Sequence, residues 1–130
     1  MESRTLRILH FNDVYDLEDK ESSIQQTEGG KKPIASASRF VTAMREHGSK
    51  DKLVFFSGDL FAPDKMSYFF KGQNMVPLYN ACNIDVTCLG NHDTDQGSEV
   101  LEKLLSLCNS PWIISNFFMP DGKTSFLNLK

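Results

Sequence analysis

The chain has 130 residues, enough for one domain or part of one, and a formal net charge of −3. Its basic residues are scattered, which gives no electrostatic footprint for nucleic acid, and no apolar run is long enough for a membrane span or a signal peptide. These features argue against a nucleic-acid or membrane partner, and we expect a cytoplasmic protein.

The N-terminal third of the chain predicts a strand, a loop and a helix. Residues 5–12 are an apolar run that predicts a strand. Residues 16–32 are polar and contain glycine, which predicts a flexible surface loop. Pro33 is expected to open a helix, because proline suits the first helical position. Apolar residues recur at helical spacing at Ile34, Ala37, Val41 and Met44, and Gly48 ends the segment.

The middle of the chain predicts a second strand and two short helices. Residues 52–57 form the strand. A helix is expected over residues 64–71, ended by Gly72, with Met66, Phe69 and Phe70 facing inward. Asn74 is a candidate cap for a further helix that carries Met75, Val76, Leu78 and Tyr79, although Pro77 argues against it.

The last third predicts two strands with a helix between them. Residues 84–89 and 111–116 form the strands, and the helix runs from Ser98, its expected cap, to Cys108. A turn from Asp121 leads into one more short strand. This alternation predicts an α/β fold with mostly parallel strands and right-handed crossover helices.

Three of the predicted strands end in polar residues. Asn12-Asp13 follows the first strand, Ser57-Gly58-Asp59 the second, and Gly90 to Asp95 the third. In an open parallel sheet these ends meet at the edge where ligands bind. Gly90 is expected to let the backbone turn sharply there. Turn formation alone explains one such ending, but three in succession favour a functional site.

The side chains at this edge predict a metal site. Asp13, Asp59 and Asn91 offer hard oxygen ligands, and His10 and His92 offer imidazoles. His10 lies inside the first strand, so we expect it in the core or behind the ligands. These oxygen and imidazole donors suit Mn²⁺, Fe, Zn²⁺ or Mg²⁺, and they do not make a soft thiolate site. A pair of such ions clamps a phosphate and generates hydroxide for in-line attack. A Rossmann-like nucleotide binder is disfavoured, because no G-x-G-x-x-G follows the first strand.

These motifs resemble those of the calcineurin-like metallophosphoesterases, and within them the 5'-nucleotidase branch. The resemblance rests on the segments 8–15, 57–59 and 90–95, and extends to the strand over 111–116. It implies that residues 1–130 are the N-terminal part of a catalytic domain, half of an α/β/β/α sandwich. It also implies hydrolysis of a phosphate ester, in particular a nucleotide, by water that two divalent ions activate. The 130-residue piece alone is expected to be inactive.

Carried over by position, the resemblance implies a role for each polar residue. Asp13 would bind the first metal ion, and Asp59 would bridge both. Asn91 would bind the second ion and help orient a phosphate oxygen. His92 would stabilise the developing charge on the phosphate or assist the leaving group, and Asp95 would be the acid paired with it.

Two departures from the family pattern bear on this assignment. Tyr15 stands where the family usually has a histidine ligand, and a neutral phenol is a poor ligand beside an imidazole. The family's later histidine motifs are missing, since the sequence holds only His10, His47 and His92. The alternative is therefore a catalytically incomplete binding or scaffold module of the same fold. Asp93 would be a turn residue or a carboxylate behind the ligands.

The missing half also has a consequence for solubility. Half of a sandwich leaves one sheet incomplete and its apolar face open. Contiguous exposed apolar surface favours association. We therefore expect the isolated chain to self-associate.

Overall fold

The computed structural model of the chain describes residues 3–15, 17, 24–27, 29–33, 36–47 and 51–129. The strands are β1 (Arg7–Phe11), β2 (Ile24–Thr27), β3 (Gly30–Pro33), β4 (Lys52–Phe56), β5 (Val86–Cys88) and β6 (Trp112–Ile113). The α-helices are α1 (Ala37–Glu46), α2 (Ser67–Phe70), α3 (Val76–Ala81) and α4 (Ser98–Leu107). Short 3₁₀ helices occur at Gln73–Met75, His92–Thr94 and Phe126–Asn128.

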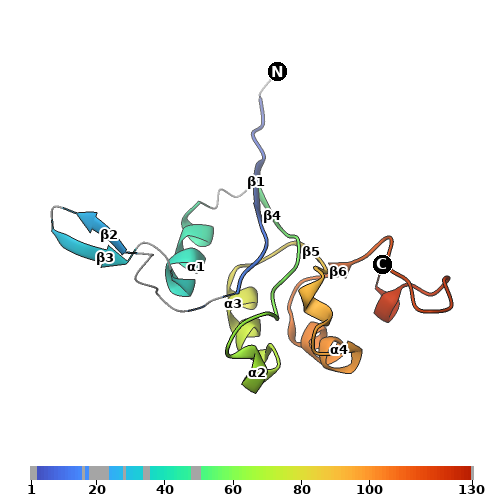
Figure 1. The fold of residues 1–130 in the computed structure, drawn as a ribbon. Coiled ribbons are helices and arrows are strands. Elements are labelled where there is room, and N and C mark those ends of the chain that lie inside the picture. The colour runs from blue at the N-terminus through green and yellow to red at the C-terminus, as the bar shows by residue number, and fades with distance from the viewer. Residues whose placement is uncertain are drawn as a thin grey trace.

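Four of the strands form one parallel sheet in the order β1-β4-β5-β6. Each connection between neighbouring strands contains at least one helix, with α1 between β1 and β4, α2 and α3 between β4 and β5, and α4 between β5 and β6. The predicted α/β class with parallel strands and crossover helices is therefore confirmed. Figure 1 shows β1 beside β4, with α3 and α4 near the lower ends of the strands.

One face of the sheet carries the hydrophobic core. Val54 and Phe56 of β4 are almost fully buried, and Leu9 and Phe11 of β1 pack against the same cluster. The helices contribute further apolar residues to it, namely Met44, Val76, Tyr79, Leu101 and Leu104. The rings of Tyr79 and Trp112 are stacked with their centroids 5.5 Å apart. This core joins the crossover helices to the sheet and so positions the loops at its edge.

A buried hydroxyl network ties α3 to the sheet. The hydroxyl oxygens of Tyr79 and Thr87 lie 2.5 Å apart, and Ser110 donates to the Tyr79 oxygen at 2.8 Å. All three residues are buried. Each hydroxyl therefore has a partner in the core, where an unpaired one would be destabilising.

The opposite face of the sheet is partly exposed in the described part of the chain. Side chains alternate between faces along a strand, so Ile8 and Ile113 point away from the core that Leu9 and Trp112 contact. Ile8 is 59% exposed and Ile113 is 43% exposed. The strands thus present apolar side chains on both faces, as strands buried on both faces do.

The segment before α1 differs from the prediction. Ile24–Thr27 and Gly30–Pro33, expected to belong to a loop and a helix start, pair as the antiparallel strands β2 and β3, which stand apart from the sheet in Figure 1. Pro33 ends β3, and α1 begins only at Ala37. The signal that decides is Ser36, whose side chain accepts a hydrogen bond from the Arg39 amide as the N-cap. Ile34 and Gly48 lie outside the described residues.

The first short helix is also smaller than predicted, and it is turned outward. The α-helical part of 64–71 is Ser67–Phe70, and its aromatic residues do not face inward. Phe69 is 82% exposed, and Met66 and Phe70 are exposed as well. A helix of one turn lacks the length for a buried stripe. The predicted cap Asn74 is also wrong, because it lies within the 3₁₀ turn that Gly72 precedes.

The C-terminal third agrees in order but differs in detail. Gly97, not Ser98, is the N-cap of α4, so no side chain caps this helix. After Asp121 the chain forms an isolated bridge between Phe118 and Ser125 and a 3₁₀ turn, instead of the expected strand. Among the described residues, no helix combines the length and apolar character that a membrane crossing needs.

Candidate functional site

The three polar strand ends meet at one edge of the sheet, as predicted. The amide of Asp13, after β1, donates to the Gly58 carbonyl at 3.1 Å, and the amide of Val14 donates to the Asp59 carbonyl at the same distance. The amide of His92, in the loop after β5, donates to Asp59 Oδ1 at 2.8 Å. Backbone hydrogen bonds therefore join the β1 loop to the β4 loop, and the Asp59 carboxylate joins the β4 loop to a backbone amide of the β5 loop.

Both carboxylates at this edge lie on strained backbone. Asp13 has a φ of +56° and Asp59 a φ of +62°. Non-glycine residues rarely adopt this left-handed conformation, and it persists only where the surrounding structure holds it. Such residues cluster at functional sites. The same conformation also occurs at Lys71, Asn83 and Leu127, so it supports the two aspartates only together with their contacts.

Gly90 is required for close packing, which corrects the expected sharp turn. Its φ is not among the positive values, but a Cβ on Gly90 would lie 2.1 Å from Asp59 Oδ1 and 2.5 Å from the Asp59 amide nitrogen. Gly58 is its counterpart, since a Cβ there would lie 2.0 Å from the Gly90 nitrogen. The two glycines let the β4 and β5 loops touch through their backbones.

Asp93 holds these two loops together from behind. Its Oδ2 accepts the amides of Asp59 and Gly90, both at 2.9 Å, and its Oδ1 accepts the amides of Leu60 and Phe61 at 2.8 and 3.2 Å. Burial raises the pKa of the Asp93 carboxyl, and the four amides oppose that shift. The residue is 2% exposed, so it anchors the site without facing solvent.

Tyr15 lies between the two strained aspartates. Its hydroxyl donates to Asp13 Oδ1 at 2.5 Å and lies 3.2 Å from Asp59 Oδ2. The side-chain amide of Asn12 donates to the other oxygen of Asp13. The hydrogen bond to Asp13, with burial and Asp59, raises the pKa of the Tyr15 hydroxyl far above its usual value, which keeps it a neutral donor. Sequence reasoning identified Tyr15 as a departure but could not predict this bridging position.

His92 and Asp95 form a pair at the rim of the same edge. The imidazole Nδ1 of His92 lies 2.8 Å from Asp95 Oδ2. The hydrogen bond to Asp95 raises the pKa of the imidazole above its ordinary value. The Tyr15 ring meets the His92 ring edge-on, with centroids 6.1 Å apart. The imidazole is thus close to the aspartate pair and oriented by a carboxylate, an arrangement suited to proton transfer.

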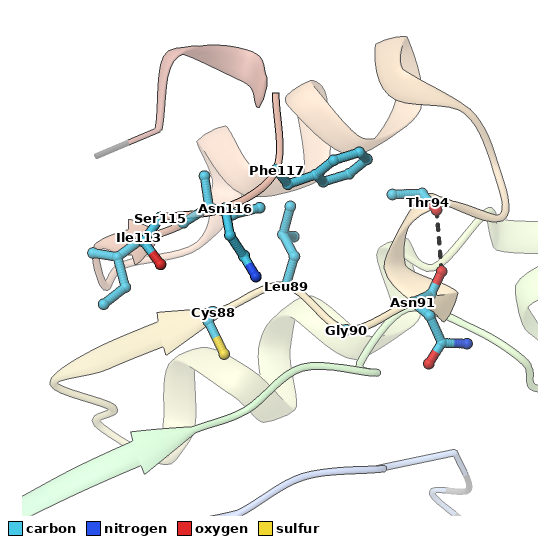
Figure 2. Close-up of a pocket in the computed structure, with 10 residues that line it drawn as sticks. Cys88, Leu89, Gly90, Asn91, Thr94, Ile113, Ser115, Asn116 and Phe117 are labelled. Atoms are coloured by element: carbon cyan, nitrogen blue, oxygen red, sulfur yellow. Dashed lines mark hydrogen bonds between the residues drawn. The ribbon is translucent and has the colours of Figure 1, made fainter. Parts of the chain in front are cut away.

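Asn91 lies between this edge and an open cavity of about 580 Å³. Figure 2 shows Asn91 and Thr94 at one end of the cavity and Ile113 and Ser115 at the other. The Thr94 hydroxyl donates to the Asn91 carbonyl at 3.0 Å, which fixes the backbone of this turn. The exposed Asn91 side chain therefore stands one residue before the amide that Asp59 accepts.

His10 is not part of the aspartate cluster. It is exposed, and its Nε2 lies 2.6 Å from the Ser57 hydroxyl oxygen. The sequence predicted it inside the core or behind the ligands, but it lies on the open face of β1, opposite Leu9 and Phe11. His47 follows α1 as its C-cap, as expected.

The donor set fits hard divalent cations only in part. Two carboxylates that share one phenol proton form a concentrated negative charge, and carboxylate and amide oxygens are ligands for Mg²⁺ or Mn²⁺. Within the described residues, however, no three His, Cys, Asp or Glu side chains are grouped to hold a metal ion. Tyr15 occupies the Asp13 side, so the oxygens of Asp59 and Asn91 are the remaining candidate ligands.

Comparison with known proteins agrees with this geometry. The model of the calcineurin-like phosphoesterase family matches residues 6–127. A snake venom 5'-nucleotidase of Crotalus adamanteus is 32% identical over 120 residues, covering 90% of this chain and 20% of that protein. The NAD 5'-nucleotidase of Haemophilus influenzae is 31% identical over 128 residues, covering 95% of this chain and 21% of that protein.

The solved structures give the same result for the fold. The structure of Haemophilus influenzae NAD nucleotidase superposes with a TM-score of 0.74 at 29% identity, covering 92% of this chain and 22% of that one. The chain thus spans about a fifth of the length of the relatives it matches. These findings confirm the resemblance drawn from the three motifs.

Proposed function

The chain belongs to the calcineurin-like phosphoesterase family, and on that premise we propose that it carries part of the active site of a metal-dependent phosphoesterase. The reaction is hydrolysis of a phosphate ester, and a nucleotide is the proposed substrate. What supports the substrate is that the matched relatives are named 5'-nucleotidases. We also propose that residues 1–130 are the N-terminal part of a longer catalytic domain, in line with the fifth of each relative that they cover.

The single observation that carries this proposal is the convergence of Asp13, Asp59 and the His92 loop at one sheet edge. Asp59 lies at its centre, since it contacts Tyr15 through one oxygen and the His92 amide through the other. Asp59 and Asn91 would hold a divalent cation there. Bound there, it would polarise the phosphate as a Lewis acid and would make a bound water more acidic. A pair of ions, as the resemblance implies, would also need Asp13.

The remaining residues have roles that need no metal. The imidazole of His92, oriented by Asp95 at 2.8 Å, is placed to stabilise negative charge on the phosphate or to give a proton to the leaving group. The hydrogen bond that raises its pKa favours the charged, proton-donating form. Asp93 holds the backbone of Asp59 and Gly90 in place, so it acts as a positioning residue.

The test is Asp59→Asn in the longest natural protein that contains this chain. Substitution by the amide keeps the shape but removes the charge that binds a cation. We expect release of inorganic phosphate from a nucleoside 5'-monophosphate, measured with added Mn²⁺, to fall at least about 100-fold, equivalent to nearly 3 kcal/mol of transition-state stabilisation. Glu102→Gln, an exposed carboxylate on α4, is the matched control and should leave the rate unchanged.

A second candidate is a binding module of the same fold without catalysis. The Tyr15 hydroxyl between the two aspartates favours it, because the position of an expected metal ligand is taken by a neutral group. In that case Asp59→Asn and the unaltered protein would both fail to release phosphate above the rate of the metal alone. Equal and substantial activity of the two proteins would overturn the proposed role of Asp59.

A further inference from the structure

We infer that the Tyr15 hydroxyl occupies the first of the two metal positions implied by the family, so that this chain holds one divalent cation, at Asp59, in place of a pair. The inference rests on the proposed function, because it concerns the same two carboxylates. It goes further in assigning to Tyr15 the neutralising and bridging task that a cation would perform.

The phenol oxygen of Tyr15 is in contact with both carboxylates. It lies 2.5 Å from Asp13 Oδ1 and 3.2 Å from Asp59 Oδ2. A divalent ion bound by both oxygens would stand about 2.0–2.2 Å from each of them. The phenol oxygen contacts the same two carboxylate oxygens that such an ion would need. An ion can enter there only if the tyrosine side chain leaves.

Asp13 already has a hydrogen-bond donor on each of its two carboxylate oxygens. Oδ1 accepts from Tyr15, and Oδ2 accepts from the side-chain amide of Asn12. Both donors lie within two residues of Asp13, so the loop satisfies its own carboxylate. A cation would have to displace at least one of these hydrogen bonds, and it would gain no imidazole ligand in exchange.

The Asp59 carboxylate, in contrast, can still accept a cation. The single phenol proton is directed to Asp13, the nearer acceptor, so the contact at 3.2 Å leaves Asp59 Oδ2 weakly engaged. Its Oδ1 accepts one amide, from His92, and a carboxylate oxygen has two lone pairs. Asp59 therefore remains an available ligand on the side of the His92 loop, where Asn91 stands.

The ring of Tyr15 is held in this place from a second side. It packs edge-on against the His92 imidazole at an interplanar angle of 88°. The ring contact and the two carboxylates therefore fix the position of the Tyr15 hydroxyl in the site. The same contact places the Tyr15 ring beside the imidazole that pairs with Asp95.

The test uses the longest natural protein that contains this chain, counts the Mn²⁺ ions bound per polypeptide by equilibrium dialysis, and measures their spacing by electron paramagnetic resonance. The unaltered chain should bind one ion with the spectrum of an isolated Mn²⁺. Tyr15→His should bind two, with the broadened spectrum of a coupled pair. Tyr15→Phe, which lacks only the hydroxyl, should bind a second ion at least tenfold more weakly than Tyr15→His does. Tyr68→Phe removes a phenol that is 85% exposed and should match the unaltered chain.

The outcomes separate this inference from the proposed function. Two ions bound by the unaltered chain overturn the inference and leave the proposed function standing. Equal binding by the unaltered chain and Tyr15→His also overturns it. If Tyr15→Phe loses the ion that the unaltered chain binds, the phenol is a ligand and the inference is wrong. If no variant binds an ion, or if Asp59→Asn binds as well as the unaltered chain, the proposed metal site itself fails. Far-UV circular dichroism checks that each variant folds. If Tyr15→His does not fold, the number of ions bound by Tyr15→Phe decides the test.

Discussion

At the scale of single residues, the carboxylate of Asp93 connects two loops that carry the site. It accepts four backbone amides, from Asp59, Leu60, Phe61 and Gly90, and it is buried. Replacing Asp93 with asparagine substitutes an N–H₂ donor for one acceptor oxygen and leaves buried amides unpaired. We expect the free energy of unfolding to fall by about 2–4 kcal/mol, measured by urea denaturation.

A neighbouring carboxylate provides the control for this experiment. Asp95 is exposed, and its side chain is hydrogen-bonded to the His92 ring. Asp95→Asn should change the free energy of unfolding by no more than about 0.5 kcal/mol. Equal destabilisation by the two substitutions would contradict the anchoring role of Asp93.

Gly90 offers a second prediction at this scale. The Cβ of Gly90→Ala would lie 2.1 Å from the Asp59 side chain, so that side chain or its loop must move. We expect cation affinity to drop at least tenfold, equivalent to about 1.4 kcal/mol, as measured by Mn²⁺ dialysis. Gly122→Ala is the comparison: nothing lies within 4 Å of its Cβ, so it adds only the backbone strain of a φ of +66°. An unchanged affinity in Gly90→Ala would show that the loop contact does not position Asp59.

Much of the site could be predicted at the level of single residues, because strand ends in a parallel sheet must meet. The sequence brought Asp13, Asp59 and the His92 loop to one edge, and the structure places them there. The contacts of Tyr15 could not be predicted, since they depend on how far the β1 loop folds toward β4. The role of Gly90 depends on the same approach of two loops, and a local reading of turn formers cannot show it.

At the scale of elements, the starts of α1 and α4 form a natural pair for comparison. Ser36 caps α1, and its oxygen accepts from the Arg39 amide at 3.3 Å, whereas Ser98 is the first residue of α4 and caps nothing. Ser36→Ala should lower the free energy of unfolding by about 1 kcal/mol. Ser98→Ala should change it by only a few tenths, because alanine suits the helix well. A larger loss in Ser98→Ala, by thermal or urea unfolding, would reverse this assignment.

The elements predicted best are those whose patterns are long. Residues 98–108 carry enough apolar residues at helical spacing to fix α4 within one residue, since two of them, Leu101 and Leu104, reach the core. The short segment 64–71 has no such redundancy. Its aromatic residues suggested burial, but a single helical turn cannot direct them inward, and Phe69 faces outward.

At the scale of the whole molecule, the alternation of strands and helices was sufficient to predict the parallel sheet. Four strands in sequential order, each joined by a crossover, leave few arrangements open. What the alternation could not predict is the hairpin of β2 and β3, which makes no pairing with the sheet in the described part of the chain. Most of its residues are polar and its turn contains Gly29, a composition shared by loops and hairpin turns alike.

The exposed face of the sheet leads to a prediction about the isolated 130-residue chain. Ile8 and Ile113 are exposed there on strands whose other face packs against the core, and apolar surface of this kind drives association. We expect sedimentation velocity to show oligomers, and Ile8→Lys to weaken the association at least tenfold, equivalent to about 1.4 kcal/mol. Phe69→Lys removes an even more exposed apolar group from α2 and should leave the association unchanged. Because both variants add the same charge, a difference between them locates the contact on the sheet. A monodisperse monomer of the unaltered chain, or an effect confined to Phe69→Lys, would show that the open face does not drive self-association.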